Sequence, residues 1–282
     1  MYNCTFETTD GNTFQFGYEY GTLFDLDPIS ELDVDISTSQ GFQQIGTTIE
    51  AETVGGVSRE IKGVFLDYTN TTLAYNMLTV FTPGTHGKLY FNDTLYCDCV
   101  VQKTPAISLV NRKRSFSLML YCAYPYWVDS EETSYSIGGY TKSFSFPVCY
   151  DEHSFGKVNG DLYISCENSG MVEIPYKVVF TSATVAEGYG IENVGTGDMI
   201  KLNDTLVSGE TVTIYREEGK LKIEKEADGE TEDVFSTLDE DSTFFSIPVG
   251  TSTLAKFADS GSSGLSVELY IQPAYTGVVV DE

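Results

Sequence analysis

The chain has 282 residues, of which 42 are acidic and 16 basic, so its formal net charge is −26 at pH 7. A field of this sign repels nucleic acid and anionic membranes, and we expect no stable nucleic-acid binding. No stretch approaches the about 18 apolar residues of a membrane helix, and the N-terminus lacks the pattern of a signal peptide. We therefore expect no membrane partner and folding in a reducing cytoplasm.

Composition favours a mainly β protein, since 19 Tyr, 17 Phe and 26 Gly suit pleated surfaces and turns. The length suggests two domains of ordinary size. We place an N-terminal β domain at 1–130, a polar linker at 131–140 that ends in Gly138-Gly139, and a C-terminal β-sandwich domain at 141–282.

The first domain opens with strand-like alternation at 14–18 and an acidic, proline-broken segment at 25–35. Within and after that segment, Leu32, Val34 and Ile36 alternate with acids. Strands near 47–51 and 59–68 follow, and the glycines between them predict a hairpin turn at 53–56.

One helix is predicted, at 70–80, where Asn70 can cap the start and Pro83-Gly84 stops the chain. A hairpin is predicted at 88–101, with its turn at Asn92-Asp93. The last strand of the domain begins at Arg112 and ends before Pro125, which cannot donate to a ladder. Its apolar face is formed by Phe116, Leu118, Leu120 and Cys122.

The second domain contains short strand-like runs at regular intervals, with turn residues between them, as in a sandwich or jelly roll. Asp228-Gly229 is one such turn. The predicted strands are 144–150, 161–167, 173–182, 199–202, 211–216, 220–226, 234–238, 244–247, 253–257 and 265–271.

Several of these segments resemble the distal tail proteins of siphophages. The strand that starts at Arg112 and closes in Tyr-Pro-Tyr-Trp is similar to the end of their N-terminal domain. The Ile45-Gly46 step, followed by Arg59-Glu60-Ile61-Lys62-Gly63, resembles an early hairpin of the family. Residues 191–195 resemble the strand that opens its C-terminal sandwich, and 269–278 resemble its last strand.

The resemblance implies an N-terminal, β-sandwich-like ring domain with one helix and a galectin-like C-terminal β-sandwich. It also implies a structural hub, not an enzyme: a homohexameric ring that links the tail tube protein to baseplate, tail-associated and receptor-binding proteins. Such a protein is a virion component of the tail tip, assembled in the bacterial cytoplasm, and its gene can lie in a prophage.

The basic trio Arg112-Lys113-Arg114 is the one dense basic cluster of the chain. It is either a solvated strand start or a subunit contact that meets an acidic rim on a neighbouring copy. When so acidic a protein associates with copies of itself, the repulsion between the copies must be offset. Opposite charges at the contact offset it locally, and salt screens the repulsion between charges that are more than about 8 Å apart.

Candidate chemistry is sparse, and we assign no catalytic, cofactor or metal residues. His86 and His153 lie in predicted loops without a nucleophile motif beside them. Cys97-Asp98-Cys99 lacks the spacing and the second cysteine pair of a zinc site. The acids at 25–35 and 228–233 do not match a calcium loop. We expect all six cysteines to be reduced, and most to be buried.

Three alternatives remain at this point. The first is a carbohydrate-binding β-sandwich at the host surface, although the second domain has no Trp for a sugar platform. The second is another virion component, such as a tube or adaptor protein. The third is an acid-rich glycosidase, since paired carboxylates are its catalytic groups.

Overall fold

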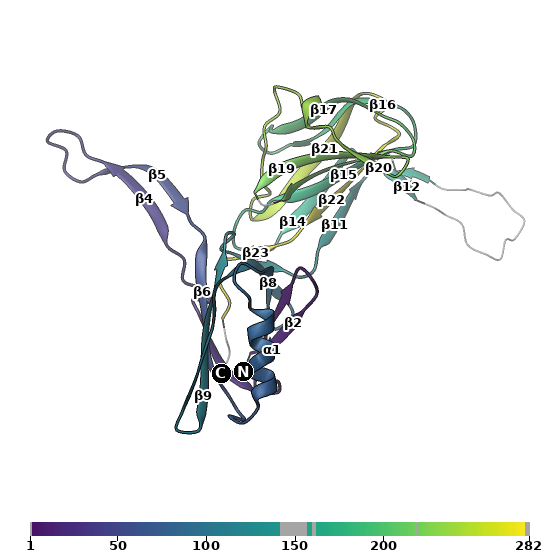
Figure 1. Cartoon of the computed structure of the whole chain (residues 1–282). Helices are drawn as coiled ribbons and strands as arrows, with labels where there is room; N and C mark the ends of the chain where they lie inside the picture. Colours follow the sequence, from purple (N-terminus) through teal and green to yellow (C-terminus); the bar gives the residue numbers. More distant parts are fainter. Residues whose placement is uncertain (1, 142–156, 160–161, 218, 280–282) are drawn as a thin grey trace, which may run out of the picture. The chain divides into compact units, whose positions relative to one another are not determined.

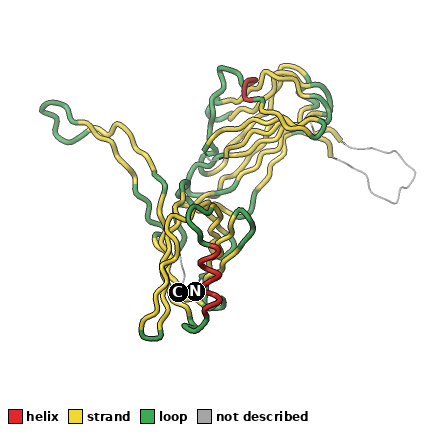
Figure 2. The backbone as a smooth tube through the Cα atoms, viewed as in Figure 1, coloured by secondary structure: helices red, strands yellow, loops and turns green. Residues whose placement is uncertain are grey.

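The computed structural model describes residues 2–141, 157–159, 162–217 and 219–279 (Figure 1). They form two compact units, the first made of Met1–Glu131 with Ala274–Glu282 and the second of Glu132–Pro273. Nearly all regular structure in the described residues is antiparallel strand, with one α-helix (Figure 2). The prediction of a mainly β fold is confirmed.

The first unit is built on a sheet in the order β2-β1-β7-β8-β9-β6-β3, with β10 paired to β8 and to β23. Its strands are β1 (Cys4–Thr8), β2 (Thr13–Phe16), β3 (Thr22–Asp27), β6 (Val57–Phe65), β7 (His86–Phe91), β8 (Leu95–Val110), β9 (Lys113–Cys122), β10 (Trp127–Asp129) and β23 (Ala274–Tyr275).

A separate two-stranded sheet is formed by β4 (Val34–Ser39) and β5 (Thr48–Val54), which pair with each other. The sequence predicted a hairpin between the strands near 47–51 and 59–68, and this is wrong. β5 pairs with β4, whereas β6 pairs with β3 and β9. The Ile45-Gly46 step lies in the β4–β5 loop and not in a strand.

The helix α1 (Thr71–Val80) begins where the sequence predicted. Asn70 caps its start, since the Asn70 side chain accepts a hydrogen bond from the Leu73 N–H at 3.0 Å. Met77 and Val80 are buried in the core. Phe81, directly after the helix, stacks on Phe6 of β1 with ring centroids 4.6 Å apart. These aromatic contacts tie the helix end to the sheet.

One hairpin and one strand face of the first unit follow the sequence prediction. Asn92 and Asp93 both have positive φ, as the two central residues of a type I′ turn require, and the Thr94 N–H donates to the Phe91 carbonyl to close that turn between β7 and β8. The alternating apolar face of β9 is buried along its whole length. Arg112 itself lies in the turn before β9, so the strand begins one residue later than expected.

The end of the chain returns to the first unit. β23 pairs with β10 through Trp127↔Tyr275, whereas β22 (Leu265–Ile271) belongs to the second unit. Pro273 separates the two strands, since proline cannot donate to a ladder. The last residues, which we had assigned to the second domain, therefore pack with the first. Part of the expected linker forms β11 (Thr133–Ile137), which pairs with β22.

The second unit is a two-sheet sandwich. One sheet has the order β11-β22-β15-β18-β19-β20 and the other β14-β21-β16-β17, with β12 paired to β13 separately. The further strands are β12 (Gly139–Thr141), β13 (Lys157–Asn159), β14 (Tyr163–Asn168), β15 (Tyr176–Ser182), β16 (Ala186–Asn193), β17 (Met199–Leu206), β18 (Thr211–Glu217), β19 (Lys220–Ala227), β20 (Glu230–Asp233) and β21 (Gly250–Ser260).

The sandwich core lies between these sheets. Phe180 of β15 meets Tyr189 of β16 edge to face, with centroids 5.3 Å apart. Side chains that alternate along the strands fill the rest, among them Val178, Ile214 and Leu269 from one sheet and Ile191, Leu202 and Leu254 from the other. This arrangement is the one that alternating apolar strands predict.

Three predicted features of this unit need correction. Residues 234–238 contain a short 3₁₀-helix, Phe235–Thr237, and residues 244–247 contribute only the bridge Ile174↔Ile247. Residues 191–193 belong to the longer β16, which follows β11 to β15 and so does not open the sandwich. The predicted strand at 144–150 lies outside the described residues.

Candidate assembly interface

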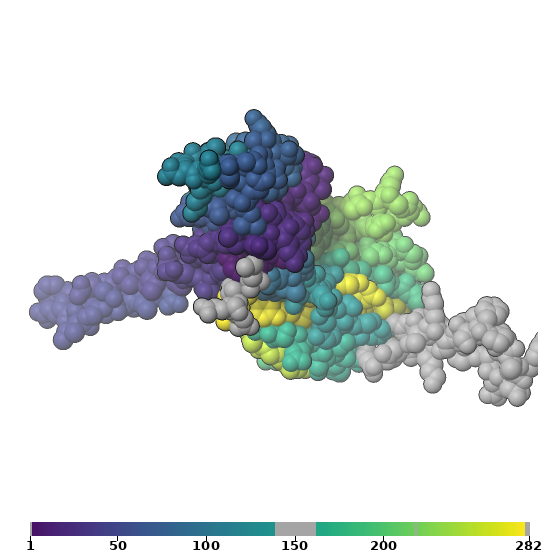
Figure 3. Space-filling model, turned by 90° about the horizontal axis from the view of Figure 1, so that it is seen from below, coloured from purple at the N-terminus to yellow at the C-terminus, as the bar shows by residue number. Residues whose placement is uncertain are grey.

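The β4–β5 hairpin extends away from the rest of the first unit (Figures 1 and 3), and every residue of both strands is exposed. The register pairs Val34 with Val54 and Ile36 with Glu52, so three apolar side chains share one face. An isolated two-stranded hairpin is marginally stable in water. An exposed apolar hairpin face is therefore a surface that gains stability from a partner.

The loop of this hairpin carries the most exposed large apolar side chains that the structure describes. Phe42 is 97% exposed and Ile45 is 102% exposed. Fully burying side chains of this size stabilises a contact by about 2 kcal/mol each. Both could therefore anchor a protein–protein contact.

The hairpin is acidic as well as apolar. Residues 31–56 contain no Lys or Arg, and their acids are Glu31, Asp33, Asp35, Glu50 and Glu52. A partner surface for this hairpin should therefore combine apolar side chains with positive charge.

The β8–β9 hairpin presents such a surface at its tip. Asn111 and Arg112 form the turn, both with positive φ. Arg112 and Lys113 are exposed, and their side chains make no hydrogen bond or ion pair with any described residue. Just before them on β8, Leu109 is 56% exposed and Val110 is 64% exposed. The tip is thus both basic and apolar.

The structure divides the basic trio predicted from the sequence. The Arg114 guanidinium donates a hydrogen bond to the Asn70 backbone carbonyl at 3.0 Å, at the start of α1. Arg114 is partly buried there, and its role in the monomer is to hold the helix start. Arg112 and Lys113 remain exposed at the tip.

The acidic hairpin and the basic tip lie at opposite ends of β6. Val57, the first residue of β6, follows the acidic hairpin after Gly55-Gly56. Phe65, its last residue, pairs with Arg114 beside the basic tip. Two complementary surfaces at opposite ends of one strand suit a head-to-tail contact between copies, the kind that closes a ring.

The Arg-X-Ile-X-Gly segment is a structural part of this first unit. Arg59 and Ile61 are both 0% exposed. A methyl group on Gly63 would collide with the Leu23 carbonyl and the Phe116 ring, so the close packing of β3 on β6 requires glycine.

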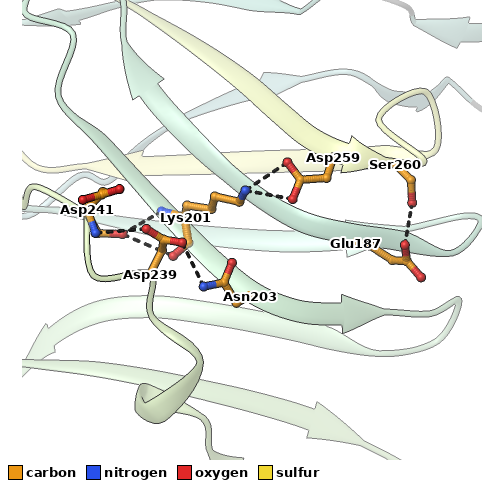
Figure 4. Close-up of polar contacts among 8 residues, drawn as sticks. Glu187, Lys201, Asn203, Asp239, Asp241, Asp259 and Ser260 are labelled. Atoms are coloured by element: carbon orange, nitrogen blue, oxygen red, sulfur yellow. Dashed lines mark hydrogen bonds and ion pairs between the residues drawn. The ribbon is translucent and has the colours of Figure 1, made fainter.

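A second polar surface lies on β16, β17 and β21 of the sandwich (Figure 4). The Lys201 ammonium contacts both Asp259 oxygens, at 2.9 and 2.8 Å. The Asp239 carboxylate accepts hydrogen bonds from the Asp241 N–H and from Asn203, each at 2.9 Å, and these bonds lower its pKa. Asp239 and Asp259 are thus both engaged by hydrogen bonds or an ion pair with neighbouring residues. This engagement does not favour their acting as the acid–base pair of a glycosidase.

A sugar platform is equally unsupported. Trp127, the one Trp of the chain, is 0% exposed in the first unit, and its indole N–H donates to the Ile29 carbonyl at 2.8 Å. Trp127 therefore offers no exposed ring on which a sugar could stack, and the carbohydrate-binding alternative gains no support from it.

The other sequence candidates are placed as follows. His86 is exposed, and it is the first residue of β7 instead of a loop residue. His153 and Cys149 lie outside the described residues. Within the described ranges, no cluster of His, Cys, Asp or Glu has the arrangement of a metal site. No helix in those ranges is long and apolar enough to cross a membrane.

Comparison with known proteins finds similarity to phage tail components. Residues 169–274 match the family described as "Siphovirus-type tail component, C-terminal domain". The fold is similar to that of the SPP1 Dit (gp 19.1) protein, described as a paradigm of hub adsorption apparatus in phages that infect Gram-positive bacteria. The TM-score is 0.67 at 12% identity, over 96% of this chain and 98% of that one.

A chain of the phage p2 baseplate in its activated conformation is also similar, with a TM-score of 0.53 at 12% identity, over 99% of this chain and 100% of that one. No curated protein sequence matches the chain. The family match and the shared fold confirm the resemblance to the distal tail proteins. This family is one of structural tail proteins and not of enzymes.

Proposed function

We propose that this protein is a hub of a siphovirus tail tip and that it assembles as a homohexameric ring through its first unit. The observation that carries the ring is the pair of complementary surfaces at the two ends of β6, acidic and apolar on the β4–β5 hairpin, basic and apolar on the β8–β9 tip. Support for the tail location comes from the family match over 169–274.

In this proposal the ring joins the tail tube protein to baseplate, tail-associated and receptor-binding proteins. It is assembled in the bacterial cytoplasm, becomes part of the virion, and can be encoded by a prophage. The galectin-like sandwich then offers surfaces to these partners without needing a sugar site of its own.

The contact is tested by charge reversal at the tip. Arg112→Glu should reduce the oligomer mass of the purified full-length protein, measured by light scattering, because like charges then face each other across the contact. The matched control is Lys220→Glu, which changes the net charge equally at an exposed position of the second unit. Arg114 is left intact because it holds the helix start.

Negative-stain images of the wild-type protein should show closed rings with six-fold symmetry. Retention of the wild-type mass by Arg112→Glu would rule out the β8–β9 tip as the contact. A wild-type protein that is monomeric at every concentration would contradict ring formation by this chain alone.

A further inference from the structure

Three of the buried cysteines gather in the core of the first unit. Cys97 and Cys99 lie on β8, and Cys122 ends β9 next to them. The sulfur atoms of Cys122 and Cys97 are 3.5 Å apart. Cys99 directly precedes Val100, whose partner on β9 is Tyr121, the residue before Cys122. Cys122 thus has two thiols within reach.

A buried cation lies beside this cluster. Arg59 of β6 is 0% exposed and pairs across the sheet with Leu120, two residues before Cys122. Its guanidinium donates to the carbonyls of Pro28 and Pro125, and it lies 4.5 Å from the centroid of the Trp127 ring. The Arg59 Nε–H is buried and has no hydrogen-bond partner among the described residues.

A buried positive charge is costly unless a nearby negative charge compensates it. No carboxylate in the described part of the chain forms an ion pair with Arg59. Hydrogen bonds from Cys97 and Cys99, together with the charge of Arg59, lower the pKa of Cys122 to about 4. Cys122 can supply the missing negative charge as a thiolate.

We propose that Cys122 is a redox-sensitive thiolate which, on exposure to a peroxide, forms a disulfide with Cys97 or Cys99 and so links β9 to β8. This goes beyond the proposed function and does not depend on it. The thiolate is the nucleophilic form of cysteine, and a second thiol in contact is what completes such an oxidation.

The two steps balance. The Cys122 thiolate attacks one peroxide oxygen, the O–O bond breaks, and sulfenic acid and hydroxide form. The neighbouring thiol then attacks the sulfenic sulfur, the S–O bond breaks, and a disulfide and water form. The Sγ–Sγ distance must shorten from 3.5 Å to about 2 Å, which side-chain rotation between adjacent strands can provide.

The same chain contains its own control thiols. Cys4 and Cys166 are also buried, but neither has a cysteine neighbour among the described residues, and burial raises the pKa of both. They share the core environment of Cys122 but not its thiol partners or its cation. Selective reaction at Cys122 would therefore reflect the cluster and not simple access of the oxidant.

The test treats the folded full-length protein with hydrogen peroxide, in a Cys149→Ser background that removes the thiol outside the described residues. Peptide mass spectrometry should find a Cys122–Cys97 or Cys122–Cys99 crosslink, while Cys4 and Cys166 stay reduced. The oxidised protein should unfold at a temperature at least about 5 °C higher, because the crosslink restricts the unfolded chain. A thiol reductant should reverse both changes.

Two results would overturn the proposal. One is that Cys122 stays reduced, or reacts no faster than Cys4 and Cys166. The other is oxidation of Cys122 to sulfinic acid without any crosslink, since the neighbouring thiols would then not resolve it. Both readouts use the native cysteine cluster, so neither depends on whether a Cys122 variant folds.

Discussion

At the scale of residues, the first unit depends on a few buried polar side chains that packing brings together. Arg59 illustrates this, because it comes from β6 but donates to the carbonyls of Pro28 and Pro125, far from it in sequence. Its guanidinium lies over the Trp127 ring, 4.5 Å from the ring centroid. The arginine thus joins three segments that the sheet alone does not connect.

We predict that Cys122 makes the stability of the first unit depend on pH. A thiol whose folded-state pKa is about 4, below its ordinary value of about 8.5, stabilises the fold above the ordinary value. That contribution falls as the pH drops toward 4, by at most about 1.4 kcal/mol per pH unit. Cys97 and Cys99 have raised pKa values, so they add no slope in this range.

The measurement is urea unfolding followed by the fluorescence of Trp127, the one Trp of the chain. The difference in unfolding free energy between wild type and Cys122→Ala should be larger at about pH 8 than at about pH 5. A difference that stays constant over this range would mean that Cys122 is a neutral thiol in the folded state.

At the scale of elements, the N-terminus of α1 is set by one side chain. Asn70→Ala should destabilise the first unit by about 1 kcal/mol, since it removes the acceptor for the Leu73 N–H. Asn70→Asp is the matched control, because it keeps the acceptor and places negative charge at the helix start. Thermal unfolding of both variants, followed by Trp127 fluorescence, separates the two cases.

The β4–β5 hairpin should matter for assembly and not for the fold. Changing Phe42 and Ile45 together to Ser should weaken the oligomer at least about tenfold, since two exposed anchors are lost. The monomer should keep its melting temperature. The control pair is Met171→Ser with Val249→Ser, two exposed apolar residues of the second unit.

Sedimentation across a range of protein concentrations measures both pairs. Equal dissociation constants for the two double variants would show that the hairpin is not part of the interface. A lower melting temperature of the monomer would instead show that the hairpin packs within one copy.

At the scale of the whole molecule, the first unit is made from both ends of the sequence. Truncation after Pro273 should therefore destabilise the first unit, because β10 loses the pairing of Trp127 with Tyr275. The unfolding transition seen by Trp127 should move to lower temperature. If that transition is unchanged, the last residues do not stabilise the first unit.

Local sequence patterns were sufficient to predict a structural feature where the physical cause of that feature lies in neighbouring residues. The cap at Asn70, the turn residues Asn92-Asp93 and the alternating face of β9 were predicted because each depends on neighbouring residues. β16 was missed as a complete strand because Gly188 and Gly190 interrupt its apolar alternation, and its residues 189–191 are buried without a break.

The candidate interface was predicted only in part. The basic trio is visible in the sequence, but its division between Arg114 and the exposed pair depends on where α1 packs. Phe42 and Ile45 could not be predicted as exposed, because apolar residues are expected in a core until strand pairing shows otherwise.

The sequence by itself determined a mainly β chain with one capped helix, strong negative charge and the likeness to phage tail proteins, because composition, period and caps are local properties. Only the tertiary structure decided that β5 pairs with β4, that β23 returns to the first unit, and that Arg59 and three thiols share one core. Such pairings depend on which faces bury one another across long separations, and that information is not contained in any single segment.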